Sequence, residues 1–262
     1  MGVLLTQSSS QYLKYANTGG SGAIIMPGGE KPWMLGCWTK PAQNGDLLGW
    51  GRSTGTTDAT TLYLAGTGKF GIRCRTASIE NTITGSQVIT ANTWHFVFGR
   101  SISSTSRRLS IIFPGGLVEH VQDTASQPAG SQCDLLAVGC QLMSAATGGT
   151  FYDGAVAECW WCPNKEVFGD VQLSTALLFQ LAYQGPFSIP TLAPYVAEYL
   201  ALRDWIPPGF NGGPNNNQRD TGINTQTLWT QVKSSGSIIL TDHPPLPYSY
   251  VRPEESYNVM TV

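Results

Sequence analysis

The chain has 262 residues, which is enough to bury a sizeable core as one large domain or as a domain with an extension. Only 12% of its residues are charged and its net charge is −2, so it lacks the basic surface that nucleic-acid binding requires. No apolar run approaches the ~20 residues of a membrane span, and the N-terminus has neither the basic nor the apolar region of a signal peptide. We therefore expect a protein that binds neither nucleic acid nor membrane and is made in the cytoplasm.

Short apolar segments, separated by turn residues, follow one another through the first two thirds of the chain. In segment 93–101, Trp94, Phe96 and Phe98 share one face of the predicted strand, and His95 and Val97 share the other. A dozen such segments at this spacing predict an antiparallel sandwich or barrel. The predicted strands are 3–7, 10–16, 32–40, 46–52, 60–66, 69–76, 86–90, 93–101, 108–115, 117–123, 133–140 and 154–162.

One helix follows these strands. It is predicted to begin near Asn164, which suits an N-cap, and to end at Gly185-Pro186. An apolar stripe would give it a buried face. The stripe consists of Leu173, Leu177, Leu178 and Leu181.

The remaining chain divides into two parts. Residues 191–205 fit either a second helix or a returning strand, and Pro194 favours the strand. Residues 206–262 are rich in glycine, proline and asparagine, which is typical of an extended arm that gains order from what it lies on. We therefore predict a sandwich domain over 1–205 and a C-terminal arm or extension over 206–262.

Several motifs follow one another in a specific order: a W-x-[KR]-P unit stands at 38–41, Trp94 opens a later strand, and an [FY]-x-G-x-[IV]-x-E strand at 152–158 leads into the predicted helix. In this order they resemble the laminin-G-like, concanavalin A-like jelly-roll family over residues 10–185. The tail segments "YVAEYLAL" and "DHPPL" also look similar to jelly-roll proteins from phage genomes. The resemblance implies an all-β antiparallel sandwich with one short helix and an extended C-terminal arm. The family includes lectins, glycoside hydrolases, adhesion modules and virion proteins, so it does not fix a function.

The stretch "CWWC" places Cys159 and Cys162 at a spacing that occurs in redox and zinc sites. In a regular strand, however, residues three apart point to opposite faces, so these two thiols would not bond to each other. A zinc site would need Cys133 and Cys140 as well, and their spacing is not that of a zinc knuckle. We favour buried core thiols in a reducing compartment for all six cysteines, and cross-strand disulfides remain an alternative.

No catalytic set is recognisable. Glycoside hydrolysis needs two carboxylates across the scissile bond, but Asp153 and Glu158 are five residues apart and so lie on opposite faces of a strand. No G-x-S-x-G elbow is present. We expect no enzyme activity and no required cofactor. Calcium is the one cofactor left open, because Asp46, Asp58 and Asp153 near turns supply oxygen ligands.

Tryptophans are the candidate contact residues for carbohydrate or protein partners. Trp50, Trp205 and Trp229 flank turns and are predicted to be exposed. The tryptophans predicted to be buried are Trp33, Trp38, Trp94 and one of Trp160 and Trp161.

Two functions from different classes follow. The first is a non-enzymatic structural protein of a bacteriophage virion, either a capsid decoration protein or a head or tail accessory protein. It would bind the major capsid protein or other virion proteins and associate with itself, with a trimer as the expected state. The low charge, the thiols and the long arm favour this reading. The alternative is a lectin-like, carbohydrate-binding module for host attachment, with a glycoside hydrolase as the third reading.

Overall fold

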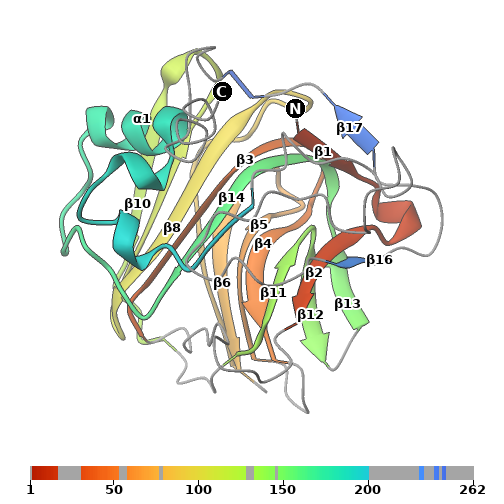
Figure 1. The fold of residues 1–262 in the computed structure, drawn as a ribbon, viewed down its shortest axis with the longest axis horizontal. Helices are drawn as coiled ribbons and strands as arrows, with labels where there is room; N and C mark the ends of the chain where they lie inside the picture. The colour runs from red at the N-terminus through yellow and green to blue at the C-terminus, as the bar shows by residue number, and fades with distance from the viewer. Residues whose placement is uncertain are drawn as a thin grey trace, which may run out of the picture.

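Two antiparallel β-sheets pack face to face in the computed structural model, and a single α-helix of the described residues covers the outer face of one sheet (Figure 1). The structure describes residues 2–16, 31–52, 58–76, 79–127, 133–144, 147–200, 230–232, 239–241 and 244–245. This arrangement confirms the predicted all-β sandwich with one short helix.

The larger sheet has eight strands in the order β10-β9-β8-β3-β14-β1-β17, and β15 pairs with the second half of β14. Its strands are β1 (Gly2–Leu5), β3 (Trp33–Gln43), β8 (His95–Ser103), β9 (Ser106–Ile112), β10 (Val118–Asp123), β14 (Asp153–Pro163), β15 (Glu198–Leu200) and β17 (Ile239–Thr241).

The smaller sheet has seven strands in the order β16-β2-β11-β4-β5-β6-β7. A separate hairpin, β12 (Cys140–Ser144) with β13 (Thr147–Phe151), lies against β4. The strands of the seven-stranded sheet are β2 (Tyr12–Ala16), β4 (Gly45–Gly51), β5 (Ala59–Leu64), β6 (Phe70–Thr76), β7 (Ile79–Thr84), β11 (Leu135–Val138) and β16 (Thr230–Val232). Short 3-10 turns are η1 (Gln7–Ser9), η2 (Pro114–Gly116), η3 (Pro186–Ser188) and η4 (Ala193–Tyr195).

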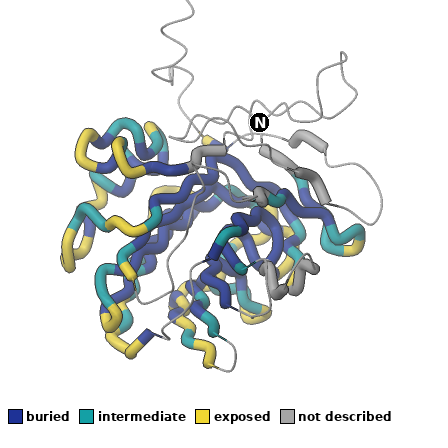
Figure 2. The backbone as a smooth tube through the Cα atoms, turned by 60° about the horizontal axis from the view of Figure 1, so that its bottom comes forward, coloured by how far each residue is buried: buried dark blue, intermediate teal, exposed yellow. Residues whose placement is uncertain are grey.

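Strand alternation divides the buried side chains into two cores, and the strands form the buried middle of the molecule (Figure 2). On β8, Val97 points between the sheets, whereas Phe96 and Phe98 point toward the helix, as the alternation predicts. The inter-sheet core includes Trp33, Trp50, Val97, Cys159 and Trp161. The helix-side core includes Trp38, Phe96, Phe98, Trp160, Cys162, Leu178 and Leu181.

A β-bulge in β14 sets which side chains enter each core. Two residues, Glu158 and Cys159, stand opposite the single Cys37 of β3, and Glu158 adopts a left-handed φ of 49°. Beyond the bulge, Trp160 enters the helix-side core and Trp161 the inter-sheet core. Both tryptophans are therefore buried.

The six cysteines are all buried free thiols. Cys159 lies in the inter-sheet core and Cys162 in the helix-side core, which confirms that the two point to opposite faces. Burial raises the pKa of Cys162 to about 12. A redox CxxC motif needs a lowered thiol pKa, so the redox reading of "CWWC" does not fit this environment.

The helix α1 (Thr175–Gln184) begins later than the sequence predicts. The left-handed φ values of Asn164 (57°) and Gly169 (70°) keep the chain before it out of helical geometry. Ser174 is the N-cap instead, and its hydroxyl accepts a hydrogen bond from the Leu177 amide at 3.2 Å. The helix ends at Gly185, as predicted. No helix among the described residues is long and apolar enough to span a membrane.

The prediction of a strand at 86–90 is wrong, and β7, which begins seven residues earlier, takes that place in the sheet. The reason lies in Glu119, whose carboxylate accepts hydrogen bonds from the amides of Ser86 and Gln87. Amides held by a side chain cannot join a strand ladder, so this segment forms a turn.

The segment after the helix returns to the larger sheet as β15, which confirms a returning strand within 191–200, and residues 201–205 lie outside the described residues. Two further strands, β16 and β17, fall within the range of the predicted arm and pair with β2 and β1. The boundary at 205/206 stays a prediction.

Candidate functional site

Trp50 is buried, so the prediction that it is an exposed contact residue is wrong. Its side chain is 1% exposed and its ring meets Trp33 edge-on, with 5.1 Å between ring centroids. The physical reason is a register shift between Asp46 and Leu48, which reverses the alternation of β4 and turns Trp50 inward. Trp205 and Trp229 lie outside the described residues.

The three aspartates considered for calcium are not gathered into one site. Asp46 lies on β4, Asp58 precedes β5 and Asp153 opens β14. Among the residues that the structure describes, no three histidine, cysteine, aspartate or glutamate side chains form a group that could hold a metal ion.

A polar cluster lies on the outer face of the seven-stranded sheet. Leu62, Ile72 and Ile83 of β5, β6 and β7 point into the inter-sheet core, so their neighbours along each strand point outward. We call this outward group the Arg73 cluster. It consists of Asp46, Thr61, Tyr63, Arg73, Glu80 and Thr84.

Arg73 stands at the centre of this cluster. Its guanidinium carbon lies 4.5 Å above the centroid of the Tyr63 ring. Its Nη1 is 3.3 Å from Asp46 Oδ1, and its Nε is 3.4 Å from Glu80 Oε1. Cation–π and ionic contacts therefore fix the guanidinium plane, while 20% of the Arg73 side chain remains exposed.

Neighbouring strands of the sheet hold the Tyr63 ring in place beneath Arg73. Gly71 pairs directly with Tyr63 across β5 and β6, and a Cβ at Gly71 would lie 2.6 Å from Tyr63 Cε1. The glycine therefore leaves the space that the Tyr63 ring occupies. The Tyr63 hydroxyl lies 3.0 Å from Thr84 Oγ1, which ties the ring to β7. The aromatic platform under Arg73 is thus held from two strands.

Asp46 is the buried acid of the cluster. Burial raises its pKa to about 6, although the Arg73 cation and the Thr61 hydroxyl, which donates a 3.1 Å hydrogen bond, both act to lower it. Its carboxylate is ionised at neutral pH and holds Arg73 in place. Because its side chain is only 1% exposed, it could affect a molecule on this surface only through Arg73.

This acid gives the stability of the fold a specific pH dependence. The pKa of Asp46 is about 6 in the folded chain and near 3.9 when unfolded, so the folded state binds more protons between these values. Its contribution to the free energy of unfolding therefore falls as the pH rises from about 4 to about 6, by roughly 2–3 kcal/mol. We expect Asp46→Asn, which cannot titrate, to lose this slope. Urea denaturation of both proteins at pH 4, 5, 6 and 7 measures the difference.

The titration of His95 changes stability with pH in the direction opposite to that of Asp46, so the two effects must be distinguished. Burial lowers the pKa of His95 to about 4, so its contribution to stability rises over the same pH interval. Both proteins contain His95, and the effect cancels in the difference between wild type and Asp46→Asn. Parallel stability curves for the two proteins would contradict the assignment to Asp46.

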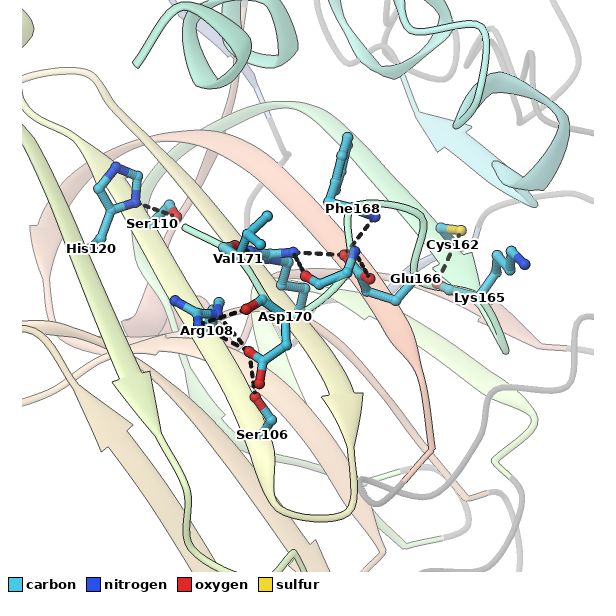
Figure 3. A network of polar contacts seen from close by, with 12 residues as sticks. Ser106, Arg108, Ser110, His120, Cys162, Lys165, Glu166, Phe168, Asp170 and Val171 are labelled. Atoms are coloured by element: carbon cyan, nitrogen blue, oxygen red, sulfur yellow. Dashed lines mark hydrogen bonds and ion pairs between the residues drawn. The ribbon is translucent and has the colours of Figure 1, made fainter. Parts of the chain in front are cut away.

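A second polar network lies on the outer face of the larger sheet (Figure 3). Arg100 of β8 donates to Glu166 Oε1 at 2.7 Å, to the Gly169 carbonyl at 2.8 Å and to the Val171 carbonyl. Glu166 in turn accepts from the Phe168 amide at 3.0 Å. Arg100 and Glu166 are both buried, so this network anchors the loop before α1 and leaves little surface for a ligand.

The neighbouring groups do not form a hydrolytic triad. Ser110 Oγ lies 2.9 Å from His120 Nδ1, which is the distance of a nucleophile and its base. The pKa of His120 is lowered by burial and by the cations Arg100 and Arg108, whereas a triad histidine is oriented by a carboxylate. Asp170 is engaged instead by Arg108 Nε, at 3.0 Å.

The sequence matches no protein-family model and no curated protein significantly. Solved structures with a similar fold include the CBM40 domain of the Ruminococcus gnavus IT-sialidase bound to α2,3-sialyllactose (15% identity, TM-score 0.47, 69% of this chain and 95% of that one). A heptameric SAP-like pentraxin from Limulus polyphemus is also similar (13%, 0.43, 69% and 81%), as are domains LG4-5 of the mouse laminin α1 chain (16%, 0.45, 63% and 42%). At these identities and TM-scores, the likenesses assign no function to the chain.

Proposed function

We propose that the chain is a non-enzymatic carbohydrate-binding module and that its ligand lies over the Arg73 cluster. The observation that carries this proposal is the guanidinium of Arg73, which is held between Asp46 and Glu80 on a side chain that is 20% exposed. Sugar hydroxyl groups both donate and accept hydrogen bonds, and they bind best to charged groups that are already held in place. Glu80 and the exposed Thr84 supply acceptors beside the Arg73 donors.

The charge of this surface favours a neutral glycan. Two carboxylates, Asp46 and Glu80, contact Arg73, and Arg75 stands opposite Glu80 in the strand register. Two acidic and two basic groups thus balance one another. An acidic sugar would have to compete with the carboxylates already paired to Arg73, whereas hydroxyl groups can use the hydrogen-bonding directions that remain.

The same geometry supports a binding role without hydrolysis. A glycosidase needs an acid that reaches the glycosidic oxygen, and a raised pKa is typical of such an acid. Asp46 has the raised pKa, but its side chain is covered by Thr61 and Arg73. We therefore expect bound glycans to be recovered intact.

A matched pair of arginine variants tests the proposal. A glycan array with the intact chain identifies the ligand, and calorimetry then measures its affinity for wild type, Arg73→Met and Arg108→Met. We expect Arg73→Met to weaken binding at least tenfold, because it removes the central donor, which corresponds to about 1.4 kcal/mol. Arg108→Met removes an arginine–carboxylate pair from the opposite sheet and should bind as wild type does.

Two results would contradict the proposal. One is the absence of binding to any neutral glycan on the array or at millimolar concentration in calorimetry. The other is an equal loss of affinity in the two variants, which would place the ligand elsewhere. Far-UV circular dichroism of both variants shows whether each retains the fold.

The role of a phage-virion structural protein that binds the major capsid protein stays a prediction from the sequence, as does the expected trimer. It is compatible with glycan binding, because a virion protein can carry a module for host attachment.

A further inference from the structure

One short segment completes the same side of both sheets. Without β16 and β17, the outermost strands there would be β2 in the seven-stranded sheet and β1 in the eight-stranded sheet. We call residues 230–241, which comprise β16, β17 and the six residues between them, the strap. Because a bare edge presents unpaired backbone groups, the strap satisfies two edges at once.

The strap is held by few pairings. Thr230, Gln231 and Val232 pair with Lys14, Leu13 and Tyr12, and Ile239, Leu240 and Thr241 pair with Leu4, Val3 and Gly2. Three residues on each sheet make a local unit that can open well below the free energy of global unfolding. Soon after β17, the buried Pro244 lacks the backbone donor that a longer strand would need.

The chain before the strap is long enough to reach a neighbouring molecule. Residues 201–229, which number 29, separate β15 from β16. At ~3.5 Å per extended residue, this length permits a reach of up to about 100 Å. A strap that crosses to a second copy would make the same backbone hydrogen bonds with β1 and β2 of that copy as it makes within its own chain. The exchange itself therefore loses no strand pairing.

We propose that the edges of β1 and β2 form an acceptor site for the strap of a second copy of this chain, so that two molecules exchange straps. The contact is reciprocal, so the exchange gives a closed dimer with two-fold symmetry in place of the trimer expected from the sequence. The low share of charged residues in the chain, 12%, leaves little electrostatic repulsion between copies. This inference is independent of glycan binding, because the Arg73 cluster lies on β4 to β7, away from the β1 and β2 edges.

Site-directed cross-linking of the full chain tests the exchange. One copy carries Leu4→Cys and one tag, and the other carries Ile239→Cys and a second tag; these positions are register partners in β1 and β17, and Leu4 is only partly buried. The six native cysteines are buried and so react slowly with a short bismaleimide. After co-expression, we expect a cross-linked species with both tags, whose share rises with protein concentration. Ile79→Cys, on an exposed edge position of β7, replaces Leu4→Cys as the control and should give no such species.

The double variant Leu4→Cys/Ile239→Cys shows whether the strap docks at all. Dimers cross-linked in this variant support the exchange, whereas cross-links confined to single chains at every concentration would overturn it. Sedimentation of the uncross-linked wild type gives an independent reading. A dimer by mass whose differently tagged copies never cross-link would also overturn the proposal, because it would mean association through another surface.

Discussion

Replacement of Arg100 by methionine is expected to reduce the free energy of unfolding by about 3–5 kcal/mol, because it leaves a buried carboxylate without its cation. The Arg100 side chain is 1% exposed and its partner Glu166 is 4% exposed, so water cannot replace the lost contact. The carbonyls of Gly169 and Val171 lose their donor at the same time. Urea denaturation followed by far-UV circular dichroism measures the loss.

Two further variants identify the cause. The double variant Arg100→Met/Glu166→Gln removes the uncompensated charge and should recover part of the stability, which a double-mutant cycle quantifies. Arg108→Met breaks the neighbouring pair with Asp170, a half-exposed carboxylate, and should cost much less. If the Arg100 and Arg108 variants lost equal stability, burial of the Arg100 pair would not explain the effect.

Replacement of Trp161 by alanine is expected to cost a similar 3–5 kcal/mol, for a reason of packing. The side chain is fully buried in the inter-sheet core. Its indole nitrogen donates a 3.2 Å hydrogen bond to the Gly49 carbonyl, which links β14 of one sheet to β4 of the other. Alanine would leave a large cavity at the centre of the sandwich and would remove this hydrogen bond between the two sheets.

Trp161→Phe separates the two contributions. Phenylalanine fills most of the volume but donates no hydrogen bond, so we expect a loss of about 1–2 kcal/mol. Equilibrium urea unfolding at pH 7 compares the two variants with wild type. A phenylalanine variant as unstable as the alanine variant would mean that the hydrogen bond, and not the filled volume, dominates.

Local patterns in the sequence predicted most of the strands and the helix end of this fold. The alternation of Phe96, Val97 and Phe98 placed each side chain in the correct core, because a strand has only two faces. The end of the helix at Gly185 could also be predicted from the residue itself, since glycine readily adopts the positive φ of 75° found there. Such features need only the residue and its neighbours.

The failures arise where a distant contact overrides the local pattern. The loop after Asn164 looked helical, but Arg100, more than sixty residues away, binds Glu166 and the carbonyls of Gly169 and Val171. Segment 86–90 looked like a strand, but the Glu119 carboxylate accepts hydrogen bonds from the amides of Ser86 and Gln87 at its start. Neither contact leaves a signal within the segment that it shapes.

The candidate site was missed for the same reason. Tryptophans were the expected contact residues, yet Trp50 points inward because of a register shift in β4 that no local sequence pattern predicts. Arg73 was visible only as one polar residue of an alternating strand. Its partner Asp46 stands 27 residues before it, and only the pairing of β4 with β5 and of β5 with β6 brings the two together.

The bulge at Glu158 has a consequence for how chains of this architecture can vary in length. Val156, Cys159 and Trp161 serve the inter-sheet core, while Ala157, Trp160 and Cys162 serve the helix-side core. Omitting Glu158 from this series leaves an unbroken alternation between the two cores. The bulge therefore absorbs one inserted residue without changing the environment of any side chain around it. A chain with or without this one residue of β14 therefore keeps every neighbouring side chain in the same core. An insertion or deletion of one residue elsewhere in the strand would instead turn the following side chains from one core to the other.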